Sequence, residues 1–313
     1  MADLSQRSDT ASSVIRDELI AGLCAAHASA QPKYLYDALG SKLFEAICEL
    51  PEYYPTRTES AIFARHGADI AESVGAGATL IDLGAGNCAK AARLFPLLAP
   101  SQYVPIDISA DFLHAAVTQL ERQFPGIAML PLGMDFSATL NLPPAVSATR
   151  RLFFYPGSSI GNFHPDEAGA FLHRLREADG DLLIGVDLVK DHAVLDAAYD
   201  DALGVTASFN LNLLNHMNRL LGADFKLREW RHRGAFNPQQ SRVEMHLEAR
   251  RDTVVRWPGG ERRFGEGERI HTENSYKYTP DSFARLLRNA GYEPAHTWTD
   301  ERDWFMVCHA CRS

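Results

Sequence analysis

A glycine turn that follows a short apolar segment constrains the fold of this chain most strongly. Residues 79–83 read TLIDL, and Gly84 and Gly86 come shortly after them. Glycine lets the backbone approach a ligand where a Cβ atom would stand in the way. A second apolar segment ends in Asp107, about twenty residues further on, where doubly wound folds place the acid that holds a ribose hydroxyl. We therefore expect a parallel sheet that binds a nucleoside-bearing cofactor.

The residues of this turn narrow the choice of cofactor. Residues 84–89, GAGNCA, fit the loose form of the dinucleotide fingerprint G-x-G-x-x-G/A. Asp82 precedes the first glycine, however, and a pyrophosphate is bound by bare N–H groups at a helix N-terminus. A carboxylate suits a cationic ligand better, and S-adenosylmethionine carries a sulfonium and an ammonium. We expect S-adenosylmethionine; a nicotinamide dinucleotide and a tight turn that binds nothing are the alternatives.

A third element of the cofactor site is expected after residues 128–132, which read as a strand. Asp135 and Phe136 follow this strand. The acid can accept a hydrogen bond from the exocyclic amine of adenine, and the apolar ring can cover a face of the base. Asp135 taken alone could equally be a helix N-cap. The order of the glycine turn, Asp107 and Asp135 favours the cofactor site.

Charge and hydropathy exclude several classes of partner. The chain has 313 residues and a formal net charge of −9, whereas nucleic-acid-binding proteins usually present a basic face. No apolar run approaches the roughly 20 residues that a membrane span needs, and residues 1–9 lack a signal-peptide pattern. We therefore expect a cytoplasmic protein without a nucleic-acid or membrane partner, and a monomer.

Cysteine and histidine spacing predicts no metal site. The five cysteines are an odd, scattered set, unlike a disulfide framework. Cys308 and Cys311 form a C-x-x-C pair, but no second pair of metal ligands accompanies it. We expect a terminal strand with incidental thiols. The twelve histidines contain no H-E-x-x-H or similar spacing.

Strand and helix patterns alternate from residue 79 to about residue 190. Strands are expected at 79–83, 103–106, 128–132, 151–155 and 181–188, and helices at 88–98, 110–124 and 166–178. This alternation is typical of an α/β fold in which helices cover both faces of a parallel sheet. Ligands of such sheets bind at the carboxyl ends of the strands.

The pattern changes near residue 191. Residues 191–221 are expected to be helical, residues 229–257 to form alternating strands, and residues 264–278 to be extended. A helix over 279–289 and two strands then close the chain. We predict a cofactor-binding domain of residues 60–190 and 279–313, and a smaller α+β substrate-binding lobe of residues 13–59 and 191–278.

Several long motifs occur together in this chain. They are LPEYYPTR at 50–57, GSSIGN at 157–162, DLVKD at 187–191, YDD at 199–201 with GVT at 204–206, and TENS at 272–275. In this order, from about residue 34 to the end, the chain resembles the histidine Nα-methyltransferases of ergothioneine biosynthesis. The resemblance implies a Rossmann-like methyltransferase sheet that uses S-adenosylmethionine. It also implies that L-histidine is trimethylated to hercynine.

The resemblance assigns roles to residues of the expected cofactor site. Gly84 and Lys90 match residues that contact S-adenosylmethionine, and Gly86 belongs to the same turn. Asp107 matches the acid that binds the ribose. Asp135 and Phe136 match the adenine contacts.

The resemblance also assigns a pocket for the amino acid. Tyr54, Asn162 and Tyr199 match residues that hold its carboxylate and α-amine. Glu273 and Ser275 match residues that hydrogen-bond the imidazole, and Met245 matches an apolar pocket residue; Glu273 and Ser275 share one face if they lie on a strand. We expect Asn162 to orient the amine lone pair, and a water or a tyrosine hydroxyl near Tyr54 to take the proton.

One residue departs from the family pattern, and two other functions stay open. Asn274 stands where an apolar residue is expected between Glu273 and Ser275, but on a strand its side chain should face away from the pocket. Relatives of such enzymes methylate other amino acids, so a different amino-acid substrate is the first alternative. A cofactor-binding regulatory protein without catalysis is the second.

Overall fold

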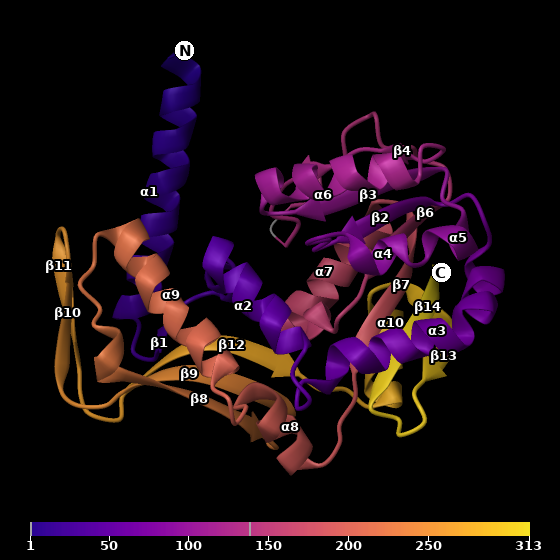
Figure 1. Cartoon of the computed structure of the whole chain (residues 1–313). Coiled ribbons are helices and arrows are strands. Elements are labelled where there is room, and N and C mark those ends of the chain that lie inside the picture. The colour runs from indigo at the N-terminus through magenta and orange to yellow at the C-terminus, as the bar shows by residue number, and fades with distance from the viewer. Residues whose placement is uncertain (1, 138) are drawn as a thin grey trace. The chain divides into compact units, whose positions relative to one another are not determined.

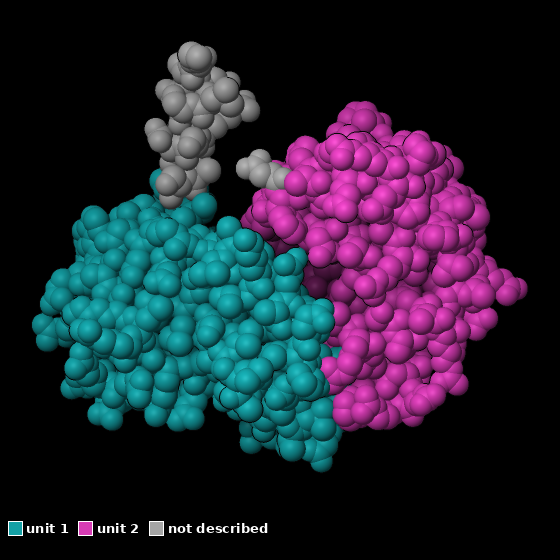
Figure 2. Space-filling model, viewed as in Figure 1, with its two compact units in different colours: residues 1–54, 190–275 teal, residues 55–189, 276–313 magenta. Residues whose placement is uncertain are grey.

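The chain divides into two compact units. The computed structural model describes residues 2–137 and 139–313 (Figure 1). Unit 1 comprises residues 1–54 and 190–275, and unit 2 comprises residues 55–189 and 276–313 (Figure 2). The chain therefore passes from one unit to the other three times, after Tyr54, Val189 and Ser275.

Unit 2 is built on a mostly parallel sheet with the strand order β13-β14-β7-β6-β2-β3-β4. The neighbouring pairs from β7 to β4 are parallel, and β14 is antiparallel to β7 and β13. A short strand β5 also pairs with β3. The strands are β2 Thr79–Leu83, β3 Gln102–Asp107, β4 Ala128–Met129, β5 Leu132–Gly133, β6 Arg151–Tyr155, β7 Gly180–Asp187, β13 Tyr292–Thr299 and β14 Phe305–Arg312.

Helices cover both faces of this sheet, as the sequence predicts. Successive strand residues point to opposite faces, so Leu80 joins a core with α3, α5 and α6, whereas Ile81 joins a core with α7 and α10. The helices of unit 2 are α3 Tyr54–Val74, α4 Ala89–Ala92, α5 Phe95–Leu98, α6 Ala110–Gln123, the 3-10 helix η2 Ser159–Asn162, α7 Pro165–Glu177 and α10 Pro280–Asn289. The predicted doubly wound α/β fold is confirmed.

Unit 1 is a smaller α+β unit. Its main sheet has the order β1-β12-β9-β8, and β10 and β11 form a separate hairpin. The strands are β1 Ala28–Ser29, β8 Trp230–Asn237, β9 Arg242–Ala249, β10 Thr253–Trp257, β11 Gly260–Phe264 and β12 Arg269–Tyr276. The helices are α1 Ala2–Cys24, η1 Pro32–Leu35, α2 Ala38–Cys48, α8 His192–Tyr199, α9 Val205–Leu221 and η3 Leu227–Glu229. Across the described residues, no helix has the length and apolar character that crossing a bilayer requires.

Several predicted elements are interrupted, and proline explains two of the breaks. The expected strand 128–132 splits into β4 and β5 around Pro131, because proline has no N–H for the ladder. The expected helix 88–98 splits into α4 and α5, since Pro96 cannot continue a helix from the preceding turn. Helix α2 begins at Ala38, where the Asp37 carboxylate caps it by accepting a hydrogen bond from the Gly40 N–H at 2.7 Å.

Candidate functional site

The glycine turn after β2 adopts backbone conformations that favour glycine. Gly84 has φ 72° and Gly86 has φ 52°, both in the left-handed region. A Cβ atom on Gly86 would meet nothing within 4 Å, so the backbone here borders open space. A Cβ atom on Gly84 would lie 3.8 Å from the ring of Phe136, which places that ring beside the turn. The turn therefore forms a cradle that a ligand can approach.

Asp107 ties this turn to the end of β3. β2 and β3 pair in parallel with Leu83 opposite Ile106, so their carboxyl ends lie side by side. One Asp107 oxygen accepts from the Gly86 N–H and the other accepts from the Ser109 N–H, each at 2.9 Å. A carboxylate has about four acceptor positions, so Asp107 can hold the turn and still accept from a ribose hydroxyl.

Asp135 and Phe136 lie beyond the end of the next strand. β5 pairs with β3 and places Gly133 opposite Asp107. The Asp135 carboxylate accepts hydrogen bonds from the backbone N–H and the hydroxyl of Ser137. Phe136 packs against Tyr155, with ring centroids 6.0 Å apart. Unit 2 thus brings the expected ribose and adenine residues to adjacent strand ends.

Lys90 lies on α4 directly after the glycine turn. Its ammonium donates to the Glu59 carboxylate at 2.7 Å. Glu59 lies on α3, is 1% exposed, and also accepts from the Gly157 N–H at 2.7 Å. Sequence reasoning missed Glu59, because an acid in the first turns of a helix ordinarily faces water. The available signal was its position two residues after the LPEYYPTR motif.

The carboxyl group of Asp82 is buried, unlike the loop carboxylate that the sequence suggests. Asp82 is 2% exposed and accepts a hydrogen bond from the Tyr103 hydroxyl at 2.7 Å. Burial raises the pKa of Asp82 to about 7, although the Tyr103 hydrogen bond works in the opposite direction. The group therefore sits beneath the turn and is only partly ionised near neutral pH.

Four of the expected substrate residues lie on three elements of unit 1, and all four are buried. Tyr199 ends α8, Met245 lies on β9, and Glu273 and Ser275 lie on β12. The Tyr199 hydroxyl donates to the Ser275 hydroxyl at 2.7 Å. The resemblance places Tyr199 at the carboxylate and Ser275 at the imidazole, but the structure makes these two side chains direct neighbours. Tyr199 thus orients the Ser275 hydroxyl.

Neighbouring residues on β12 have different partners. The Asn274 side-chain oxygen lies 2.8 Å from Nε2 of His271, whereas Ser275 bonds to Tyr199. The His271 ring in turn packs against His246, with centroids 5.1 Å apart. The side chain of Asn274 is therefore directed to a histidine pair rather than to Tyr199.

Tyr54 is fully buried at the start of α3 and is paired with a lysine. The Lys190 ammonium donates to the Tyr54 hydroxyl at 2.8 Å and lies 4.4 Å from the centroid of its ring. A tyrosine oxygen that accepts from an ammonium can still donate its own hydrogen. Sequence reasoning used the DLVKD motif for the resemblance but assigned no role to Lys190.

Asn162 belongs to unit 2, unlike the other expected substrate residues. It ends the 3-10 helix η2, after Ser158 in the left-handed conformation with φ 61°. The Ser158 hydroxyl accepts a hydrogen bond from the Asp187 N–H at 2.9 Å, which anchors this loop to the end of β7. The expected substrate residues therefore do not all belong to one unit.

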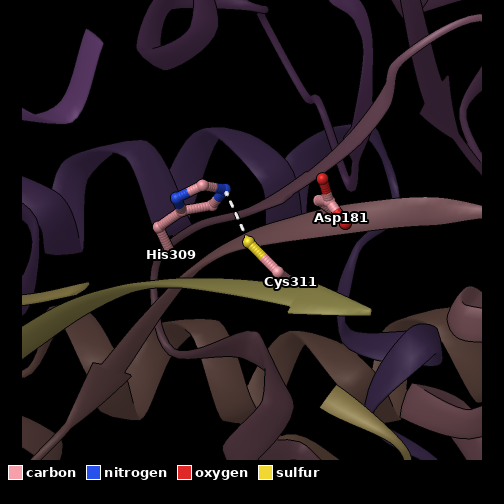
Figure 3. A group of neighbouring side chains, drawn as sticks. All are labelled: Asp181, His309 and Cys311. Carbon is pink, nitrogen blue, oxygen red and sulfur yellow. Dashed lines mark hydrogen bonds between the residues drawn. The ribbon is translucent and has the colours of Figure 1, made fainter. Parts of the chain in front are cut away.

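A further group of polar side chains lies on β7 and β14. Asp181, His309 and Cys311 place one possible metal-ligand atom each within 4.8 Å of one another (Figure 3). His309 Nδ1 lies 2.7 Å from the Ser73 hydroxyl, and the Asp181 carboxylate accepts from the Arg312 N–H at 3.1 Å. Burial raises the pKa of the Cys311 thiol, which disfavours the thiolate that binds metals. These contacts explain the group as strand packing, and we assign no metal to it.

The fold and the residues at the strand ends define a class of protein. A doubly wound sheet with a glycine turn and acidic residues at the carboxyl ends of adjacent strands is an architecture that binds nucleoside-bearing cofactors. The profile of the family described as "Histidine-specific methyltransferase, SAM-dependent" matches residues 15–312. The chain belongs to this family.

Curated relatives cover nearly the whole chain. A histidine N-alpha-methyltransferase of Mycolicibacterium smegmatis is 40% identical over 313 residues, which cover 97% of each chain. The protein of the same name from Mycobacterium tuberculosis is 38% identical over 308 residues, which cover 95% of each chain. Ergothioneine biosynthesis protein 1 of Neurospora crassa is 32% identical over 277 residues, which cover 85% of this chain and 31% of that protein.

Proposed function

We propose that this protein transfers methyl groups from S-adenosylmethionine to the α-nitrogen of L-histidine and forms hercynine, as a step of ergothioneine biosynthesis. The observation that carries the proposal is the buried polar pair on β12. Glu273 is 7% exposed and Ser275 is 4% exposed. The family and the curated relatives support histidine as the substrate.

The polar pair suits a neutral imidazole, which has one N–H donor and one acceptor nitrogen. The Glu273 carboxylate can accept from the ring N–H, and the Ser275 hydroxyl, oriented by Tyr199, can donate to the other nitrogen. Buried polar groups left without a partner cost about 1–3 kcal/mol each. A substrate without both ring nitrogens is therefore disfavoured, while the buried Met245 offers apolar contact to the ring.

The remaining substrate residues suit the amino-acid head group. We assign the carboxylate to the hydroxyls of Tyr54 and Tyr199, and the α-amine to Asn162. The ammonium of Lys190, 2.8 Å from the Tyr54 oxygen, adds positive charge on the carboxylate side. Because ammonium and carboxylate attract, this charge favours an amino acid over an amine that lacks the carboxyl group.

The residues at the strand ends of unit 2 fit the cofactor. Gly84 and Gly86 leave room at the turn, and Lys90 offers a cation to the carboxylate of S-adenosylmethionine. Asp107 can accept from the ribose, and Asp135 with Phe136 can contact the adenine. When bound, S-adenosylmethionine supplies a methyl group on a sulfonium, which departs as a neutral thioether.

We propose that the protein accelerates the reaction chiefly by orienting the amine and the cofactor. The residues above would orient the amine toward the methyl group that bound S-adenosylmethionine would supply, and correct orientation alone contributes roughly 7–11 kcal/mol. The α-amine must be neutral to attack, yet an α-amine is largely protonated near pH 7. We propose that Asn162 accepts from an amine N–H in the first two transfers and so directs the lone pair; the neutral dimethylated amine has no N–H left to donate in the third. A water or a tyrosine hydroxyl near Tyr54 takes the proton.

Mass spectrometry of the purified protein with S-adenosylmethionine and each of the twenty amino acids tests this function. We expect a product from histidine that is heavier by three methyl groups. A methylated product from another amino acid alone would keep the methyltransferase and replace the substrate. No product from any amino acid, with S-adenosylmethionine still bound, would favour the non-catalytic regulatory protein.

We also infer that the protein works as a cytoplasmic monomer without a nucleic-acid partner. The net charge of −9 supports the last point, because it opposes binding to a polyanion. Light scattering on a size-exclusion column measures the mass in solution, for which we expect the 34.6 kDa of one chain.

A further inference from the structure

Glu59 is a buried acid near the cofactor residues, with one contact to helix α4 and one to the loop after β6. It lies on α3 and is 1% exposed. One carboxylate oxygen accepts from the Lys90 ammonium at 2.7 Å, and the other accepts from the Gly157 N–H at 2.7 Å. A buried charge is tolerated when it is paired and hydrogen-bonded, and Glu59 meets both conditions.

Two glycines make room for this contact. A Cβ atom on Gly185 of β7 would lie 2.2 Å from a carboxylate oxygen of Glu59, so any side chain there would displace the acid. A Cβ atom on Gly157 would lie 3.0 Å from the Lys90 ammonium, and Gly157 has φ 76°, which also favours glycine. The space around the carboxylate and the ammonium therefore depends on both positions.

The contact joins α4 and the loop after β6 at the same edge of the sheet. Lys90 follows the glycine turn after β2, and Gly157 follows β6, which pairs with β2 in parallel. The Lys90 side chain is 39% exposed although its ammonium is bonded to Glu59. An ammonium has three N–H donors, so it can bond to Glu59 and still donate to a ligand.

We propose that Glu59 is a positioning residue for S-adenosylmethionine and acts through Lys90. The carboxylate is the sole anionic group of S-adenosylmethionine, so it is the natural partner of a lysine. A lysine side chain is long and flexible, and binding must order it. Glu59 orders the Lys90 ammonium in the free protein and so favours binding. The inference rests on the cofactor role proposed for Lys90.

Comparing the binding of two ligands distinguishes a role of Glu59 in cofactor binding from a purely structural role. S-Adenosylhomocysteine carries the amino-acid carboxylate, whereas 5′-methylthioadenosine has the same adenosine and thioether but lacks that carboxylate. Glu59→Gln removes the negative charge and keeps an oxygen acceptor for the Gly157 N–H. Calorimetry then measures the affinity of each ligand. Glu72→Gln, an exposed acid on the same helix, is the matched control.

We expect Glu59→Gln to weaken S-adenosylhomocysteine binding about tenfold or more, as for the loss of an oriented charged hydrogen bond. Binding of 5′-methylthioadenosine should change less than about twofold on the same reasoning. Lys90→Met should give the same pattern, and the double variant should bind no more weakly than Lys90→Met alone. Glu59→Asp, which keeps the charge with a shorter reach, should recover part of the affinity.

Equal losses for the two ligands would overturn the proposal and leave Glu59 a structural anchor. An unchanged affinity for S-adenosylhomocysteine would also overturn it. Failure of the unsubstituted protein to bind S-adenosylhomocysteine would instead contradict the proposed function itself, so the two failures are distinguishable.

Discussion

At the scale of single residues, we propose that the buried Tyr54 and its cationic neighbour Lys190 bind the substrate carboxylate. Lys190 donates to the Tyr54 hydroxyl at 2.8 Å. We expect Lys190→Met to raise the KM for histidine by about tenfold to a hundredfold, because a charged hydrogen bond contributes about 1.5–3 kcal/mol, and to change kcat less. Steady-state kinetics measure both, with Lys226→Met, an exposed lysine of the same unit, as the control. An unchanged KM would remove Lys190 from substrate binding.

Also at the scale of single residues, the proposed imidazole site depends on Glu273. We expect Glu273→Ala to abolish histidine methylation, because the ring N–H loses its acceptor, while S-adenosylhomocysteine binds as before. Asn274→Ala is a neighbouring control, since Asn274 bonds to His271 instead of Tyr199. Its turnover should fall much less than that of Glu273→Ala, because the Asn274 side chain contacts His271. Histidine turnover by Glu273→Ala at the original rate would refute the role of Glu273.

Single residues also show what the sequence can and cannot predict. The glycine turn and Asp107 were predictable, because their spacing follows from the geometry of parallel strands, and the structure joins them through the Gly86 N–H. The partners of Lys90 and Tyr54 were not predictable, because Glu59 and Lys190 reach them from distant parts of the sequence. Whether an acid such as Asp82 faces a loop or the core depends on packing, which the local pattern does not record.

At the scale of elements, the strands were easier to predict than their interruptions. β2 and β6 are short apolar runs between turn signals, and they have the predicted bounds. The break between β4 and β5 depends on Pro131, whose effect varies with its place in the sheet. This break matters for the site, because β5 leads directly to Asp135 and Phe136.

The packing of β2 against β3 predicts a pH-dependent stability. Burial raises the pKa of Asp82 on β2 to about 7, against about 3.9 in an unfolded chain. Between these values the folded protein holds a proton that the unfolded chain has released. This group therefore lowers the free energy of unfolding as pH rises from about 4 to about 7, by up to roughly 1.4 kcal/mol per pH unit.

We expect Asp82→Asn to remove this contribution, because the amide does not titrate. Urea unfolding at several pH values between about 4.5 and 7.5, the range in which the group titrates, measures the free energy of unfolding. Glu72→Gln, at an exposed acid on α3, should leave the slope of the original protein unchanged. Parallel curves for Asp82→Asn and the original protein would show that Asp82 titrates normally in the fold.

At the scale of the whole molecule, the chain assembles each unit from separated segments. β1 pairs in parallel with β12, with Ala28 opposite Ile270, so the N-terminal segment completes a sheet formed by the second half of the chain. β1 has only two residues, and so short a segment has no hydrophobic pattern from which its pairing with β12 could be predicted. This is why the sequence predicts the strands of the insertion but not the order of its sheet.

The division into units predicts where each ligand protects the backbone from hydrogen exchange. The proposed cofactor residues all belong to unit 2, and the proposed substrate residues other than Asn162 belong to unit 1. A bound ligand stabilises the segments that it contacts by mass action. The gain is about 2.7 kcal/mol when the ligand concentration is a hundred times the dissociation constant. S-Adenosylhomocysteine alone should therefore slow exchange at residues 84–90, 107–109 and 133–137.

L-Histidine, added to the complex with S-adenosylhomocysteine, should slow exchange further at residues 196–200, 243–247 and 272–276 of unit 1, and at residues 159–163 around Asn162. Hydrogen-exchange mass spectrometry reads both patterns, and histamine is the matched ligand without the carboxylate. Because Tyr54 and Lys190 are assigned to the carboxylate, histamine should protect residues 272–276 and leave residues 188–191 unchanged. Protection by histidine confined to unit 2 would contradict the assignment of unit 1 as the substrate-binding lobe, whatever the methyl acceptor proves to be.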